Sequence, residues 1–187
     1  MVEAVLNKRI ILTNINIPNI LAFIRLFIAP IMFMFLVNRD LFANIHPSWL
    51  DFLAAFLFVF ASLTDFFDGY IARKFNQITQ LGKILDPLAD KMLTLAGFLG
   101  LMMLDRANPW AIYLILTREF FITGLRVAAV SENKEISASF LGKIKTITQM
   151  FAIGFLIMNW PGGTLLLWLA VFITLYSGYE YIKEYLK

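Results

Sequence analysis

Apolar residues fill the chain in long continuous blocks, and short polar segments separate the blocks. Each block has about 20 residues, the length that a helix needs to cross the hydrocarbon core of a bilayer. The blocks lack the alternation of a membrane β-strand, so the pattern predicts helices. We predict six transmembrane spans, at 18–38, 48–68, 84–104, 109–130, 142–160 and 163–182.

This pattern predicts an all-α integral membrane bundle, with residues 1–187 as one domain because no loop is long enough to fold alone. Residues 1–15 combine apolar and basic positions and favour a short interfacial helix. The composition agrees, since 60% of residues are hydrophobic and 16% are charged. The absence of cysteine excludes disulfides and thiolate metal sites. The net charge of +3 gives no indication of nucleic-acid binding.

The basic residues outside the apolar blocks predict the orientation in the membrane. Only Arg39 and Arg106 lie on one set of helix ends. Ten lie on the other set: Lys8, Arg9, Arg73, Lys74, Lys83, Lys134, Lys143, Lys145, Lys183 and Lys187. Because cytoplasmic loops carry an excess of Lys and Arg, both termini and the 69–83 connection are predicted to be cytoplasmic.

Four aspartates stand at the cytoplasmic ends of the second and third spans. Asp65 and Asp68 are three residues apart, and Asp86 and Asp90 are four apart, so each pair shares a helix face. The connection between the two spans is short, which favours neighbouring antiparallel helices. The four carboxylates are therefore expected to converge at one depth.

Like charges in such a cluster repel one another, and divalent cations would remove the repulsion. Oxygen ligands without His or Cys favour hard ions such as Mg²⁺, Mn²⁺ or Ca²⁺. The alternative is that these aspartates cap helix ends and face water, which is the better explanation for one Asp but a poor one for four. Small residues and a planar cation lie between them and suit a pyrophosphate: Gly69, Ala72, Arg73 and Gly82.

The spacing Asp65-x2-Asp68-Gly69-x2-Ala72-Arg73-x8-Gly82-x3-Asp86-x3-Asp90 resembles the complete signature of the CDP-alcohol phosphatidyltransferase family. The resemblance implies a usually dimeric six-helix membrane enzyme with a two-metal site at the cytoplasmic face. It implies transfer of a phosphatidyl group from a CDP-lipid to an alcohol, with release of CMP. By the same resemblance Asp65, Asp68 and Asp86 are the main metal ligands, and Asp90 contacts the second metal and is the general base. Gly69, Ala72, Arg73 and Gly82 would line the CDP pocket.

Further cations indicate an anionic acceptor. Arg118 and Arg126 lie near one face of the fourth span, about 80° apart at 100° per residue, and Lys143 and Lys145 begin the fifth. A pocket built from them suits the phosphate of glycerol 3-phosphate, whose free hydroxyl would attack. The alternative is structural: Arg126 would pair with Glu119, and the lysines would extend to lipid headgroups.

The flanking segments NIPNILAFIRLFIAP, TREFFITGLR and GKIKTITQM are similar to one branch of the family, the bacterial enzymes that make phosphatidylglycerol phosphate. Asn19 and Arg25 fit that branch and are predicted to lie near the CDP-lipid. A buried arginine in a span is costly, so Arg25 belongs beside the nucleotide or the aspartates, or in a structural ion pair. Ala22 departs from the branch, which commonly has a small hydroxyl residue there.

We therefore expect a transferase of phospholipid biosynthesis in the bacterial inner membrane, with a cytoplasmic active site. Its substrates would be CDP-diacylglycerol and glycerol 3-phosphate among membrane lipids, its cofactors two Mg²⁺ or Mn²⁺ ions, and its assembly a homodimer. One alternative is another acceptor, such as inositol phosphate or a lipid. The other is a small divalent-cation transporter, although a transporter needs its acidic residues near the midplane.

Overall fold

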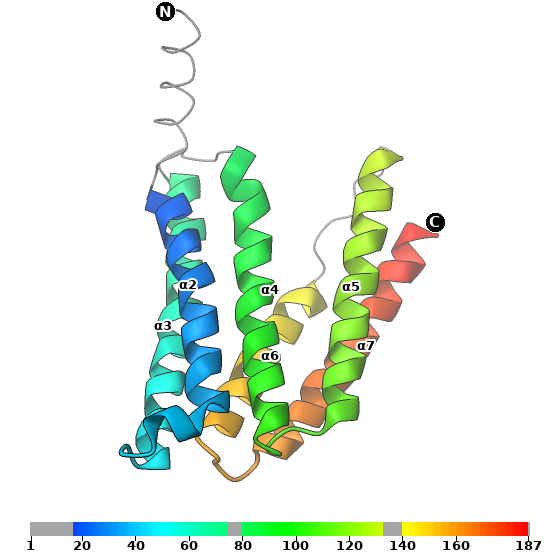
Figure 1. Cartoon of the computed structure of the whole chain (residues 1–187). Coiled ribbons are helices and arrows are strands. Elements are labelled where there is room, and N and C mark those ends of the chain that lie inside the picture. Colours follow the sequence, from blue (N-terminus) through cyan, green and yellow to red (C-terminus); the bar gives the residue numbers. More distant parts are fainter. Residues whose placement is uncertain (1–16, 75–79, 133–139, 187) are drawn as a thin grey trace, which may run out of the picture. The chain divides into compact units, whose positions relative to one another are not determined.

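The computed structural model describes residues 17–74, 80–132 and 140–186, without the side chains of 17–18, 66–74, 80–81, 83–84 and 130–131. The predicted interfacial helix at 1–15 lies outside the described residues. Six α-helices and one short 3-10 helix make up the described chain, which contains no strand (Figure 1). The elements are α2 (Ile17–Val37), η1 (Arg39–Phe42), α3 (Pro47–Lys74), α4 (Gln80–Met103), α5 (Pro109–Ser131), α6 (Phe140–Ile157) and α7 (Gly163–Tyr185).

The all-α prediction is confirmed, and the helices follow the predicted spans closely. Four helices are long and apolar enough to cross a membrane: α2, α3, α6 and α7. The helices α4 and α5 are of similar length, but their charged residues interrupt the apolar stretch instead of lying at its ends. The spans 84–104 and 109–130 therefore stay predictions, and the charges that set them apart include four that were singled out for function: Asp86, Asp90, Arg118 and Arg126.

The α3 helix is longer than its predicted span. It continues from the expected end at 68 to Lys74, and α4 already begins at Gln80. The 69–83 connection is therefore helical at both ends, and Gly69 lies inside α3. A helix needs no apolar sequence once it leaves the bilayer, and one glycine costs only about 1 kcal/mol.

Side chains in the turns before α3 and α5 cap the first turns of these helices. The Nδ1 atom of His46 accepts a hydrogen bond from the backbone N–H of Ser48 at 3.3 Å, at the start of α3. The Oδ1 atom of Asn108 accepts one from Trp110 at 2.9 Å, at the start of α5. Both contacts satisfy backbone donors that have no partner inside the helix. His46 thus has a structural role in the described chain.

The helices group into two compact units that meet within α4, at Gly97. In unit 1, residues 1–97, α2 packs along α3 (Figure 1). Small side chains are fully buried on both helices, among them Ala22, Ala54 and Ala61, and they let the helix backbones approach closely. An ion pair joins Arg39 of η1 to Asp51 of α3 near the connection between the two helices of this hairpin. Close packing and this ion pair thus hold α2 and α3 in a fixed arrangement.

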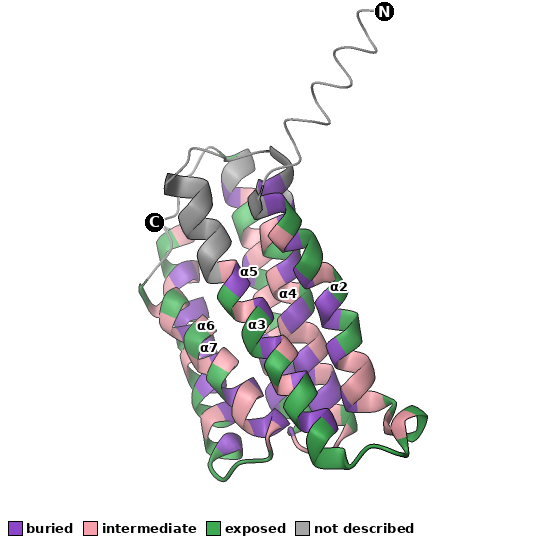
Figure 2. Cartoon of the chain, turned by 90° about the vertical axis from the view of Figure 1, so that its left-hand side faces the viewer, coloured by how far each residue is buried: buried purple, intermediate pink, exposed green. Residues whose placement is uncertain are grey.

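In unit 2, residues 98–187, α7 packs against both α5 and α6. Buried residues recur along these helices between more exposed ones (Figure 2), and on α7 they include Leu167, Ala170 and Val171. Arg106, in the turn before α5, donates a 2.6 Å hydrogen bond to the backbone oxygen of Ile157 at the end of α6. This contact satisfies a carbonyl that the helix end leaves without an internal partner.

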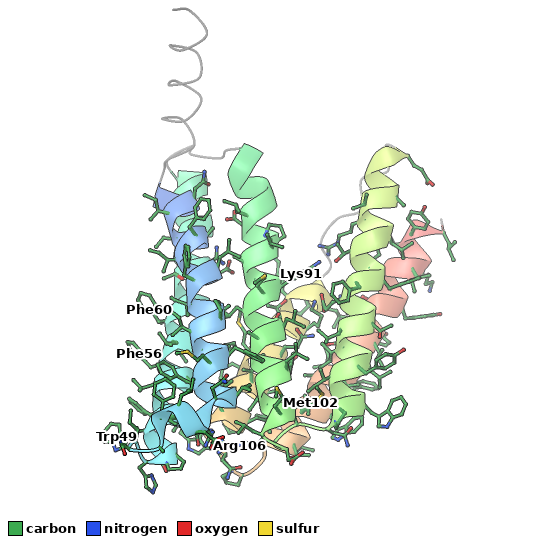
Figure 3. The ribbon with its side chains drawn as sticks, in the orientation of Figure 1. Trp49, Phe56, Phe60, Lys91, Met102 and Arg106 are labelled. Carbon is green, nitrogen blue, oxygen red and sulfur yellow. The ribbon has the colours of Figure 1, made fainter. Side chains whose placement is uncertain are left out.

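Large apolar side chains cover the outer faces of the helices. Phe56 and Phe60 of α3 project outward in Figure 3 and stack on each other with ring centroids 6.2 Å apart. Trp49 and Trp110 are also exposed and lie in the first turns of α3 and α5, and Trp160 is exposed just before α7. Such faces are stable against lipid, and tryptophan is typical of the membrane interface. The protein is an integral membrane protein.

Candidate functional site

A buried arginine joins two of the predicted metal ligands in unit 1. Arg25 of α2 is fully buried. Its Nη1 atom donates a hydrogen bond to the carboxylate of Asp65 on α3, and its Nη2 atom lies 3.8 Å from Oδ1 of Asp86 on α4. Two carboxylates that are 21 residues apart in the sequence therefore lie around one guanidinium group. Asp65 and Asp86, two of the four aspartates predicted to converge, thus lie beside the same arginine.

The other predicted residues of this region are described less fully. Asp90 is half-buried and lies one turn beyond Asp86 on α4, while Gly82 and Asn19 are buried. The side chains of Asp68, Ala72 and Arg73, and the surroundings of Gly69, lie outside the described residues. Among the described side chains, no three acidic or histidine residues form a group that could hold a metal ion. The four-carboxylate cluster, which needs Asp68, stays a prediction.

The chemistry of the described pair nevertheless fits a divalent cation. Oδ1 of Asp86 is buried and accepts no hydrogen bond from the described residues. A buried carboxylate oxygen in this state is costly, and a metal ion would give it a partner. Carboxylate oxygens are also the ligands that Mg²⁺ and Mn²⁺ prefer. Asp65 and Asp86 are therefore suitable ligands by position and by type.

A second polar cluster lies in unit 2 and joins all three of its long helices. Glu119 of α5 forms ion pairs with Lys145 of α6 and with Nη1 of its neighbour Arg118, the latter at 3.4 Å. Nη2 of Arg118 donates a 2.7 Å hydrogen bond to Oγ of Ser177 on α7. The cluster contains two cations and one carboxylate, and all three charged side chains are mostly buried. This excess of positive charge favours an anionic ligand.

Neighbouring polar groups extend the cluster between α6 and α7. Gln149 donates a 2.9 Å hydrogen bond to Oγ1 of Thr174, and both residues are buried. Gly178, next to Ser177, lies against the side chain of Arg118. A cavity of about 300 Å³ opens beside Arg118 between α5 and α7, and apart from Arg118 its lining is mostly apolar, with Leu114, Phe121 and Ile182. The polar residues of α7 thus fix one side of the cluster.

The structure separates the four cations predicted to bind the acceptor. Arg118 and Lys145 meet at Glu119, whereas Lys143 is exposed and the guanidinium carbon of Arg126 lies 5.4 Å from the centre of the Tyr181 ring. The structural alternative paired Arg126 with Glu119, whereas in the described chain Glu119 pairs with Lys145 and Arg118, and Arg126 lies over the Tyr181 ring. Lys145 is buried, so the expectation that it extends to lipid headgroups is wrong.

Sequence reasoning assigned no functional residue to the last span and so missed its contribution. Thr174, Ser177, Gly178 and Tyr181 follow one another at helical spacing and are all buried. The sequence did contain an indication, because these small or polar residues recur on one side of a helix whose other residues are mostly bulky and apolar. The indication was weak, since none of the four carries a charge.

Comparison with known proteins identifies one family whose similarity extends over residues of both units. A family model described as CDP-alcohol phosphatidyltransferase matches residues 15–176. A Rickettsia felis protein named CDP-diacylglycerol–glycerol-3-phosphate 3-phosphatidyltransferase is 39% identical over 178 residues, which cover 90% of this chain and 94% of that protein. A Bacillus subtilis protein of the same name is 44% identical over 138 residues, 70% of this chain and 72% of its own length. A Mycobacterium tuberculosis protein named probable phosphatidylglycerophosphate synthase is 34% identical, with 92% and 82% covered.

Proposed function

This chain belongs to the CDP-alcohol phosphatidyltransferase family, and on that premise we propose that it transfers the phosphatidyl group of CDP-diacylglycerol to glycerol 3-phosphate. The products are phosphatidylglycerol phosphate and CMP, so the reaction belongs to phospholipid biosynthesis. The names of the similar bacterial proteins favour this acceptor over inositol phosphate or a lipid. Membership of a transferase family also argues against the cation transporter.

One observation carries the proposal: Asp65 and Asp86, from opposite ends of the family signature, lie around the guanidinium of Arg25. The proximity of these two signature residues supports a shared site for the signature. Members of the family generally depend on a divalent cation. Asp65, Asp68, Asp86 and Asp90 would hold two Mg²⁺ or Mn²⁺ ions. When bound, such ions neutralise the charge on a pyrophosphate and on the oxygen that leaves with CMP.

The remaining signature residues have roles that follow from their chemistry. Asp90 accepts the proton of the attacking hydroxyl, because a carboxylate within hydrogen-bond reach is the available base. Arg73 contacts phosphate oxygens of the CDP-lipid with its planar group. Gly69, Ala72 and Gly82 leave space for the nucleotide, and Asn19 of α2 contributes a polar group at the same pocket. The acyl chains stay in the bilayer beside the exposed apolar faces.

We assign the acceptor phosphate to the cationic cluster of unit 2. Arg118 and Lys145 have one shared carboxylate between them, and this leaves one positive charge that a phosphate can use. Arg118 also borders the cavity between α5 and α7. Arg126 and Lys143, which are more exposed, attract the anion from the cytoplasm rather than hold it.

The proposal includes the setting of the enzyme. The Lys and Arg distribution places both termini and the active site on the cytoplasmic side of the bacterial inner membrane. The assembly is proposed to be a homodimer, as the family resemblance implies. Crosslinking in membranes tests the assembly, and protease accessibility of the 133–139 segment tests the orientation.

Release of CMP by the purified protein tests the function directly. The assay contains CDP-diacylglycerol, Mg²⁺ or Mn²⁺, and one alcohol at a time: glycerol 3-phosphate, glycerol, inositol phosphate, serine or a lipid alcohol. We expect rapid CMP release only with glycerol 3-phosphate, and loss of release with EDTA. Faster turnover with inositol phosphate would contradict glycerol 3-phosphate as the acceptor and assign the enzyme to another branch of the family. Equal turnover with glycerol would contradict a phosphate-binding cluster.

A further inference from the structure

The reaction alone does not explain the position of Arg25. Its side chain is fully buried in unit 1, it donates to Asp65, and it lies 3.8 Å from Asp86. We propose that Arg25 is an internal counter-cation, which holds Asp65 and Asp86 together in the metal-free protein and competes with a bound dication for them. This inference rests on the proposed function, because it takes both carboxylates as metal ligands.

The burial of the Arg25 guanidinium beside two partly exposed carboxylates supports the first part of this role. A buried guanidinium stays charged, because arginine does not lose its proton in proteins. It is stable there only beside opposite charge, and its planar fork can contact two carboxylates at once. Removal of Arg25 would leave Asp65 and Asp86 facing each other without a counter-charge. The metal-free protein should therefore be less stable without Arg25.

The competition follows from the balance of charge. One guanidinium between two carboxylates leaves one negative charge, so the group still attracts a cation. A dication at the same oxygens is repelled by Arg25 over a distance of a few ångströms, where such repulsion is strong. Arg25 therefore weakens metal binding at the same time as it stabilises the metal-free state. The two effects are separable by experiment.

The chain contains a matched control. Arg39 pairs with Asp51 on the same α2–α3 hairpin, with side chains that are 22% and 10% exposed. This ion pair involves one carboxylate of α3 that is not part of the signature. Arg25→Met and Arg39→Met remove the same group from two ion pairs of one unit, but only the first removes it from the predicted metal ligands.

The experiment uses the full-length protein in detergent micelles. The melting temperature is measured in EDTA and in MnCl₂, and the Mn²⁺ dissociation constant is measured by electron paramagnetic resonance. For Arg25→Met we expect a lower melting temperature in EDTA, a larger rise on adding Mn²⁺ than in the wild type, and at least about fivefold tighter Mn²⁺ binding. For Arg39→Met we expect an equal loss in both media and unchanged Mn²⁺ affinity. Unchanged or weaker Mn²⁺ binding by Arg25→Met overturns the inference.

Two further variants keep the result interpretable. If Arg25→Met does not fold, Arg25→Lys replaces it, because an ammonium group keeps the charge but does not span two carboxylates. We then expect a lower melting temperature in EDTA and a larger Mn²⁺-induced rise, and an unchanged rise overturns the inference. Asp86→Asn separates the two proposals. Unchanged Mn²⁺ affinity in Asp86→Asn rejects Asp86 as a metal ligand, whereas weaker binding by Asp86→Asn together with unchanged affinity in Arg25→Met rejects only the counter-cation.

Discussion

Gly178 of α7 lies directly against the side chain of Arg118 of α5. A methyl group at position 178 would come within 3.1 Å of Cγ and Nε of the arginine, which is closer than side chains normally approach. The adjacent Ser177 accepts a 2.7 Å hydrogen bond from Nη2 of the same arginine. The last helix therefore fixes the position of Arg118 from two sides.

Gly178→Ala should weaken the use of glycerol 3-phosphate. The added methyl group displaces Arg118 from Ser177, so we expect the KM for glycerol 3-phosphate to rise roughly tenfold, or about 1.4 kcal/mol, while kcat and the KM for CDP-diacylglycerol change less than about twofold. Initial rates of CMP release measure all three constants.

Two matched variants control for the added methyl group. Gly124→Ala in α5 and Gly154→Ala in α6 place it where no atom lies within 4 Å, so both should behave as wild type. In an Arg118→Ala background, Gly178→Ala should add almost nothing. A full additional effect there would show that Gly178 acts through another group. An unchanged KM in Arg118→Ala itself would remove the arginine from the acceptor site.

Glu119→Gln should lower the stability of unit 2. The substitution leaves Lys145 and Arg118 buried without their carboxylate, which costs about 2 kcal/mol or more of unfolding free energy. Thermal unfolding in detergent measures the loss. The double variant Glu119→Gln with Lys145→Met should recover part of it, because only one buried cation then remains. No recovery would mean that the contact with Lys145 contributes little.

Asp90→Asn should abolish turnover and leave metal binding in place. An amide does not accept the hydroxyl proton, so we expect CMP release to fall by about 10²–10⁴-fold. Mn²⁺ binding should persist through the other carboxylates. Asp105→Asn is the control, since Asp105 is an exposed turn residue with φ of 54°, a conformation that asparagine also adopts. Substantial activity in Asp90→Asn would remove the assignment of the base.

His46→Ala should affect stability without affecting catalysis. The ring nitrogen caps the start of α3, and loss of a cap costs about 1 kcal/mol. The same argument applies to Asn108→Ala at α5, where the hydrogen bond is shorter, 2.9 Å against 3.3 Å, so the loss should be larger. Thermal unfolding gives both values. A change in KM for either substrate in His46→Ala would contradict a purely structural role.

The helix positions were predictable because lipid requires long apolar blocks, and the ends of α5 and α7 fall within three residues of their predicted bounds. The end of α3 was not predictable in the same way. Hydrophobicity reports where a helix leaves the bilayer, whereas α3 continues beyond that point to Lys74 through backbone hydrogen bonds of its own.

The candidate site was predictable where charge made burial costly. The aspartates and Arg25 stand out because they are expensive in an apolar block, and the short link between two spans brings Asp65 near Asp86. Glu119 and Lys145 lie on α5 and α6, and the connection between these helices does not determine which of their residues face each other. Sequence spacing alone therefore does not predict this pair. Ser177 and Gly178 carry no charge, and their role depends on the side chain of Arg118 that packs against them.

The two arginine–aspartate pairs of unit 1 share one alignment. Fourteen residues separate Arg25 from Arg39, and fourteen separate Asp51 from Asp65, so the hairpin satisfies both pairs in a single antiparallel alignment. Insertions or deletions between residues 43 and 46 leave both intervals intact and should be tolerated. One extra residue inside α3 between 51 and 65 makes the spacing of the two aspartates differ from that of the two arginines. The hairpin then keeps only one of its two ion pairs. The length of this stretch is therefore under a stricter constraint than its individual lipid-facing side chains.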